Sequence, residues 1–121
     1  MKISITDSEL EIMKVLWKKG SATSREILEG VSGDEIKNRN TVKTLLMRLV
    51  AKDAVKYEKI NERAYKYKPL VKEQEYITQS SDRFLDKLFE GSAKKLILNF
   101  VQSEKISKDE LEELIKQLGD E

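Results

Sequence analysis

The sequence predicts a mainly α (α+β) fold in which an N-terminal winged helix-turn-helix domain is followed by a C-terminal helical dimerisation domain. Two observations support this prediction. The segment 38–52 carries its apolar residues on one face at helical spacing, and two strand-like runs, 54–60 and 64–67, follow it directly. A helix followed by a basic hairpin is typical of a winged-helix module.

Three helices are expected before the hairpin. The first begins at a capping box, Thr6 to Glu9, in which each side chain satisfies a free backbone N–H of the first turn, and it ends near Gly20. A second capping box, Thr23 to Glu26, opens a shorter helix. Asn38 is a good N-cap residue for the third helix, which is expected to run to about Lys52.

Pro69 marks the expected domain boundary, because proline can neither continue a hydrogen-bonded ladder nor sit inside a helix. We expect a winged-helix DNA-binding domain over residues 1–70 and a helical dimerisation domain over residues 71–121. The second domain should contain three helices: one from about Lys72 to Glu90, one after Gly91, and a last one opening at a third capping box, Ser107 to Glu110.

The C-terminal segment carries more large apolar side chains than it can bury alone. Burial of such a side chain stabilises by roughly 1.5–3 kcal/mol, so leaving the whole set in water would be costly. Two copies packed about a two-fold axis would cover the set, and the alternative is that these helices fold back on the N-terminal domain. The dimerisation residues are expected to be Ile77, Phe84, Leu85, Leu88, Phe89, Leu96, Ile97, Phe100, Leu114 and Leu118.

Composition excludes several kinds of site. Cysteine and histidine are both absent, which removes the usual ligands of zinc, copper and iron–sulfur clusters. The same absence rules out Cys/His and Ser/His/Asp catalysis, and no glycine-rich phosphate loop is present. We expect no enzyme activity, no cofactor and no metal. With no membrane-length apolar run and no signal core, a cytoplasmic protein is expected.

The net charge of +1 hides an uneven distribution. Between Ile36 and Lys72, eleven basic residues stand against three acidic ones, whereas from Glu73 onward seven basic residues stand against twelve acidic ones. A basic segment joined to an acidic one suggests that the two parts have different partners. The alternative is two solvated surfaces of opposite sign.

The exposed side of the third helix is the candidate reader of DNA. Asn can pair with adenine, Lys and Arg favour guanine, and a threonine methyl group can touch thymine. Cations at the helix ends suit phosphates instead. An exposed polar helix face is commonly only solvated, but the basic hairpin beside it favours DNA contact. The candidate contacts are Ser24 on the second helix, Arg39, Asn40, Thr41, Lys43, Thr44, Met47, Arg48 and Lys52 on the third, and Lys59 and Arg63 at the hairpin tip.

Three tyrosines alternate with lysines along the hairpin. Because successive side chains of a strand point to opposite faces, Tyr57, Tyr65 and Tyr67 predict one aromatic face and one cationic face. Such tyrosines can stack on single-stranded bases. We expect them instead to pack on the helices.

Four stretches together resemble the penicillinase-repressor family (BlaI/MecI type). They are DSELEIMKVLWKKG, TVKTLLMRLVAKDAV, AYKYKP and LILNFV, and they follow the family's order and spacing over essentially the whole chain. The resemblance implies a cytoplasmic dimeric repressor that binds inverted-repeat operators of β-lactam-resistance genes. It assigns Thr41, Lys43, Thr44 and Arg48 to the reader positions and Arg63 to the wing.

The resemblance also implies a way of ending repression. The best-known members are cut between an Asn and a Phe when a membrane sensor-protease detects antibiotic, and Asn99 and Phe100 stand at the matching place. Such a cut would weaken the dimer and its bivalent hold on two half-sites. The alternative is that Asn99 and Phe100 are an ordinary surface-and-core pair. The copper-responsive branch of the family carries a C-terminal cysteine motif that binds metal. Because this chain has no cysteine, derepression controlled by metal through that motif is excluded.

A different class of function is also compatible with the sequence. The winged helix could serve as a binding surface for another protein, with the acidic helices as a docking platform, which would make the chain an interaction adaptor. Strong salt dependence of DNA binding and preference for a palindrome would argue against the adaptor.

Overall fold

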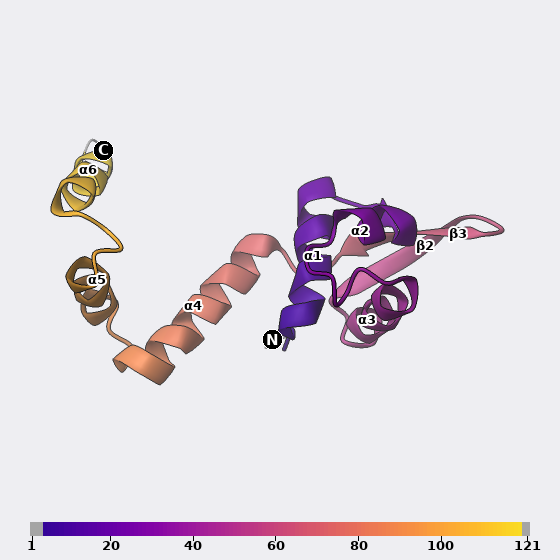
Figure 1. The fold of residues 1–121 in the computed structure, drawn as a ribbon, viewed down its shortest axis with the longest axis horizontal. Coiled ribbons are helices and arrows are strands. Elements are labelled where there is room, and N and C mark those ends of the chain that lie inside the picture. Colours follow the sequence, from indigo (N-terminus) through magenta and orange to yellow (C-terminus); the bar gives the residue numbers. More distant parts are fainter. Residues whose placement is uncertain (1–3, 120–121) are drawn as a thin grey trace. The chain divides into compact units, whose positions relative to one another are not determined.

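The computed structural model describes residues 4–119, which fall into two units divided after Ile77 (Figure 1). The first unit contains α1 (Asp7–Lys19), β1 (Ala22–Thr23), α2 (Ser24–Gly30), α3 (Arg39–Ala51), β2 (Val55–Asn61) and β3 (Ala64–Pro69). The helix α4 (Glu73–Phe89) begins in the first unit, and α5 (Ala93–Gln102) and α6 (Lys108–Gly119) belong to the second. The predicted mainly helical α+β fold class is confirmed. The domain boundary expected at Pro69 stays a prediction.

The three predicted capping boxes are confirmed. At the start of α1, the Thr6 N–H donates to Glu9 Oε1 at 2.9 Å and the Glu9 N–H donates to Thr6 Oγ1 at 3.2 Å. The same reciprocal pair opens α2 and α6. Asn38 caps α3 as expected, since its Oδ1 accepts the N–H groups of Asn40 and Thr41. These local bonds fix where the helices begin.

The sheet has three antiparallel strands in the order β1-β3-β2. Tyr57 stands opposite Tyr67 and Lys56 opposite Lys68, so the predicted aromatic and cationic faces of the hairpin are confirmed. The short strand β1 pairs with β3 through Ala22 and was not predicted. Two residues are too few to show the alternation by which strands are recognised.

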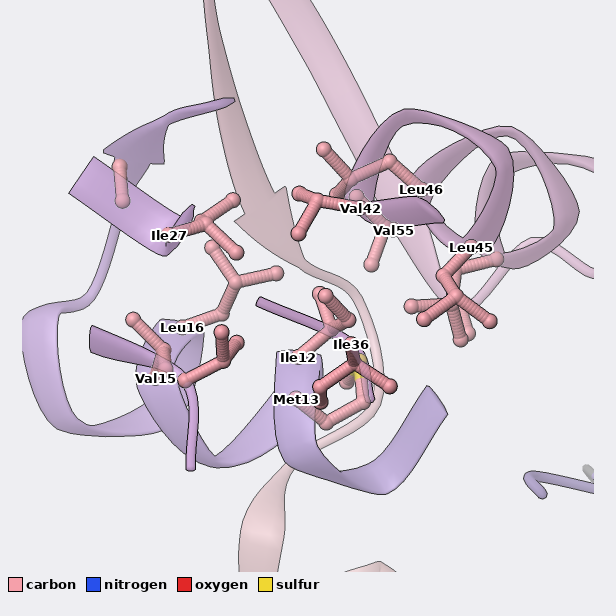
Figure 2. Packing of buried hydrophobic residues seen from close by; sticks show 14 of the residues in the cluster. Ile12, Met13, Val15, Leu16, Ile27, Ile36, Val42, Leu45, Leu46 and Val55 are labelled. Atoms are coloured by element: carbon pink, nitrogen blue, oxygen red, sulfur yellow. The ribbon is translucent and has the colours of Figure 1, made fainter. Parts of the chain in front are cut away.

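The core of the first unit lies between α1, α2, α3 and the inner ends of the strands. Ile12 and Leu16 from α1 and Val42 from α3 point into one cluster of apolar side chains (Figure 2). Ile12 is fully buried in this cluster. The helix α2 ends at Gly30, and Val31 caps it in an extended conformation while staying buried.

A tryptophan attaches the segment after the hairpin to α1. Trp17 Nε1 donates to the backbone oxygen of Val71 at 2.8 Å, and its ring lies 5.7 Å from that of Tyr76, centroid to centroid. Val71 is itself buried. The start of α4 therefore packs with the first unit.

The second unit has no core of its own among its described residues. From residue 73 to residue 119 no side chain is buried, and several large apolar ones are widely exposed. Leu88 is 60% exposed and Leu118 is 73% exposed. Each of α4, α5 and α6 is amphipathic, and these helices present their apolar faces without covering them.

One buried carboxylate joins α1 to the end of α3. Glu9 is 1% exposed, and its Oε1 accepts both the Thr6 N–H and the Lys52 ammonium. Lys52 Nζ also donates to the backbone oxygen of Ser4 at 2.8 Å. Burial raises the pKa of Glu9, but the bonds from Lys52 and Thr6 outweigh it and hold this pKa below its ordinary value.

Substituting Lys52→Met is expected to lower the free energy of unfolding by about 2–3 kcal/mol, because Glu9 would stay buried without its cation. Urea unfolding at neutral pH measures the loss. Lys14→Met is the matched control, since Lys14 makes an exposed pair with Glu11 on α1 and should cost less than about 0.5 kcal/mol. Equal losses in the two variants would contradict the structural role of Lys52.

The effect of Lys52→Met should also depend on pH. The pKa of Glu9 lies below its ordinary 4.5, so the pair stabilises the fold above pH 4.5 and this contribution disappears as the pH falls through the folded-state pKa. Wild type and Lys52→Met should therefore converge in acid. A stability difference that stays constant with pH would mean that Lys52 acts through packing alone.

Candidate nucleic-acid interface

The outer face of α3 stands opposite its buried stripe. Val42, Leu45, Leu46 and Leu49 are buried, while Asn40, Lys43, Thr44, Met47 and Arg48 are all exposed. Met47 is 67% exposed, which is unusual for an apolar side chain in the middle of a helix. This separation of faces follows from the helical period, because residues three and four apart share a side.

Two threonines on α3 have less polar surface available to a partner than the residues around them. The Thr44 hydroxyl donates to the backbone oxygen of Asn40 at 2.9 Å, so its hydrogen is already committed within the helix. Thr41 is half-buried, and its N–H belongs to the Asn38 cap. Of the predicted reader residues, Asn40, Lys43 and Arg48 therefore keep the most polar capacity at the surface.

The wing tip is shaped by an asparagine. Asn61 Oδ1 accepts the Arg63 N–H at 2.9 Å, which closes the turn between β2 and β3. The hairpin runs outward past α3, and Lys59 and Arg63 are exposed near its end (Figure 1). Among the described residues 4–119, the ion pairs involve neither these two cations nor Lys43 and Arg48.

The structure gives Lys52, predicted to bind a phosphate, partners within the chain. The structure places the Lys52 ammonium on the buried carboxylate of Glu9 and on the backbone oxygen of Ser4. A cation that neutralises a buried charge cannot leave it for a phosphate without a large energetic cost. The remaining end-of-helix candidates, Arg39 on α3 and Ser24 at the first residue of α2, are exposed.

An open hollow of about 310 Å³, which was not predicted from the sequence, lies between α3 and the wing. It is lined by Met47, Val50, Tyr57, Tyr65 and Tyr67. The expected packing of the tyrosines on the helices holds for Tyr67, which is half-buried against the core, whereas Tyr57 is 54% exposed and Tyr65 40% exposed. The hollow could have been predicted from one feature of the sequence, an exposed methionine on α3 followed by tyrosines on one face of the hairpin.

The tyrosine rings of this hollow pack against one another. The rings of Tyr57 and Tyr65 meet edge to face, with centroids 5.5 Å apart and planes at 83°. Tyr57 also lies 6.1 Å from Tyr67. Burial raises the pKa of the Tyr67 hydroxyl, and the two neighbouring tyrosines raise it further. Its hydroxyl therefore stays neutral in the physiological range.

Other kinds of site find no support in the part of the chain that the structure describes. Within residues 4–119, no group of three or more acidic, His or Cys side chains could hold a metal ion. None of the described helices is long and apolar enough to cross a bilayer. The exposed faces of α3 and the wing remain the most distinctive surface of the first unit.

Comparison with known proteins gives consistent matches over nearly the whole chain. The family described as "Penicillinase repressor" matches residues 5–120. The penicillinase repressor of Bacillus licheniformis is 34% identical over 114 residues, covering 94% of this chain and 88% of the relative. The methicillin resistance regulatory protein MecI of Staphylococcus aureus (strain N315) is also 34% identical, over 110 residues, covering 91% of this chain and 89% of the relative.

The fold of the first unit has a solved counterpart. The solution structure of the DNA-binding domain of the repressor BlaI is 37% identical to this chain and superposes with a TM-score of 0.53. The match covers 62% of this chain and 92% of that domain. The predicted winged-helix fold is thereby confirmed.

Proposed function

The chain belongs to the penicillinase repressor family, and we propose that it is a dimeric, sequence-specific DNA-binding repressor of β-lactam-resistance genes that acts in the cytoplasm. The observation that supports this most is the placement of an exposed polar and cationic face on α3 beside a basic wing. In this proposal α3 enters the major groove, which is wide enough for a helix, and the wing reaches the adjacent minor groove.

The proposed contacts divide into base readers and phosphate binders. Asn40, Lys43 and Arg48 face base edges, and Thr41, Thr44 and Met47 contribute apolar contacts and close approach. The phosphate binders set the register of the protein on the duplex without reading sequence. They are Ser24, Arg39, Lys59 and Arg63.

The double variant Lys43→Ala/Arg48→Ala is expected to bind an inverted-repeat operator about 100-fold more weakly, because two base-directed cations are lost. Mobility shift across a salt series on the DNA upstream of the chain's own gene measures it. Lys105→Ala/Lys108→Ala removes the same charge from two exposed positions, one just before α6 and one at its first residue, and should bind like wild type. Wild-type binding that ignores both salt and sequence would instead favour the protein-interaction adaptor.

The second unit supports a dimer, because its apolar faces have no cover within the described chain. Ile97 on α5 is 44% exposed and Leu114 on α6 is 47% exposed. A second copy of the chain offers matching apolar faces, since a two-fold axis brings the same surface together from both sides. Two DNA-binding units on one dimer hold both halves of an inverted repeat, which raises the effective affinity.

Ile97→Asp is expected to shift the protein from dimer to monomer, because it places a charge in the proposed interface. Sedimentation equilibrium measures the change. The matched control is Leu98→Asp, since Leu98 is 54% exposed on the same helix but is turned by 100° from Ile97 and lies outside the predicted dimerisation set. Monomers in both variants, or dimers in both, would contradict the assignment of this face.

We propose further that repression ends by cleavage between Asn99 and Phe100. In the folded chain this bond lies inside α5, where the Asn99 oxygen accepts the Ser103 N–H at 2.9 Å and the Ser103 hydroxyl at 2.8 Å. A protease needs an extended substrate, so local unwinding of α5 must precede the cut. A membrane sensor-protease that responds to antibiotic is the proposed partner.

Exposure of cells to a β-lactam is expected to produce a fragment ending at Asn99, detected by mass spectrometry of the recovered chain. Phe100→Ala should reduce the yield of this fragment, because it alters the residue after the cut. The matched control is Val101→Ala, which changes a neighbouring apolar residue on the same helix. Induction with the full-length chain intact, or with a cut elsewhere, would contradict the proposal.

A further inference from the structure

We propose that the hollow between α3 and the wing holds one sugar–phosphate strand of duplex DNA, with the hydroxyls of Tyr57 and Tyr65 donating to a phosphate. This inference rests on the proposed function and extends it to the surface between the exposed face of α3 and the strands of the wing. The ligand is the DNA backbone itself, whatever its sequence.

The topology of a duplex requires a backbone strand between α3 and the wing. Neighbouring major and minor grooves of a duplex are separated by a single sugar–phosphate strand. A protein with a helix in one groove and a wing in the next therefore straddles that strand, which must pass between the two elements. In this chain the space between α3 and the wing is the hollow lined by Met47, Val50 and the three tyrosines.

The chemistry of the lining suits a sugar–phosphate strand. Met47 and Val50 present apolar atoms, which suit the carbon face of a deoxyribose. Tyr57 and Tyr65 are widely exposed and bring hydroxyl donors, and tyrosine is one of the side chains that donate to phosphate oxygens. The hollow thus offers apolar contact and hydrogen-bond donors side by side, as a sugar–phosphate chain requires.

The cations beside the hollow favour a negatively charged occupant. Lys59 stands directly opposite Tyr65 in the hairpin register, so it shares the tyrosine face and lies beside the hollow. Lys43 is four residues before Met47 on α3 and therefore lies on the same side of that helix, one turn away. Cations from both elements next to an apolar floor favour a polyanionic occupant over an apolar peptide.

The ring geometry argues against single-stranded bases as the occupant. Tyr57 and Tyr65 meet at 83°, so both rings cannot lie parallel to one stack of bases. Stacking on successive bases would need rings presented face-on along a strand. The hydroxyl groups, rather than the ring faces, are the part of this pair suited to a duplex.

The test is the double variant Tyr57→Phe/Tyr65→Phe, which removes two hydroxyls and leaves the rings. Operator binding is expected to weaken about 5- to 150-fold, the effect of losing two hydrogen bonds of ordinary net strength at the protein surface. The salt dependence should stay unchanged, because no cation is lost, whereas Lys59→Gln should reduce the salt slope by about one unit. Non-specific duplex DNA should lose the same factor, because phosphates carry no sequence information.

The matched control is Tyr76→Phe. Tyr76 packs on Trp17 in the same unit, away from the hollow, and its loss of a hydroxyl should leave operator affinity unchanged. Thermal unfolding checks that both tyrosine variants keep the wild-type fold.

Position-resolved DNA makes the test decisive. Neutral methylphosphonates placed one at a time along the operator should weaken wild-type binding at a phosphate between the two grooves in each half-site. The Tyr57→Phe/Tyr65→Phe variant should lose its sensitivity at that phosphate alone. A double variant that binds like wild type, or that keeps the full methylphosphonate pattern, would overturn this inference and leave the repressor function standing. Failure of the wild type to bind duplex DNA would overturn the proposed function and this inference with it.

Discussion

Burial of one face of α3 determines what the first unit can present to a partner. Leu46 and Leu49 are almost completely excluded from water, together with Val42 and Leu45. Because these side chains pack against α1, α2 and β2, the helix cannot rotate without exposing apolar surface. Its opposite face, with Lys43 and Arg48, is therefore held outward in one orientation, and the wing that follows α3 is fixed beside it.

The two units solve the same physical problem in different ways. The first buries its apolar side chains within one chain and uses Trp17 and the Glu9–Lys52 pair to fasten its ends. The second leaves Leu88 and Leu118 mostly in water, and in the proposed dimer a second copy of the chain covers them. In that proposal DNA recognition and dimerisation belong to different units, and loss of the dimer would weaken DNA binding without disturbing α3.

Local signals in the sequence predicted much of this architecture. The capping boxes that begin at Thr6 and Thr23 and the alternating hairpin tyrosines depend only on neighbouring residues, and all were confirmed. The pair of Lys52 with Glu9 was not predicted, because Glu9 is distant in sequence and helical spacing cannot reveal such a pair. The hollow between α3 and the wing was missed for the same reason: its lining depends on how the hairpin folds against the helix.

In the proposed complex, α3 and the wing bind neighbouring grooves of the same duplex. Hydroxyl-radical footprinting of the wild-type protein on its operator tests this claim most directly, because it reports backbone protection nucleotide by nucleotide. We expect two half-sites, each with protection on both sides of one major groove and in the minor groove next to it. Protection confined to a single groove, or a single half-site at saturating protein, would contradict it.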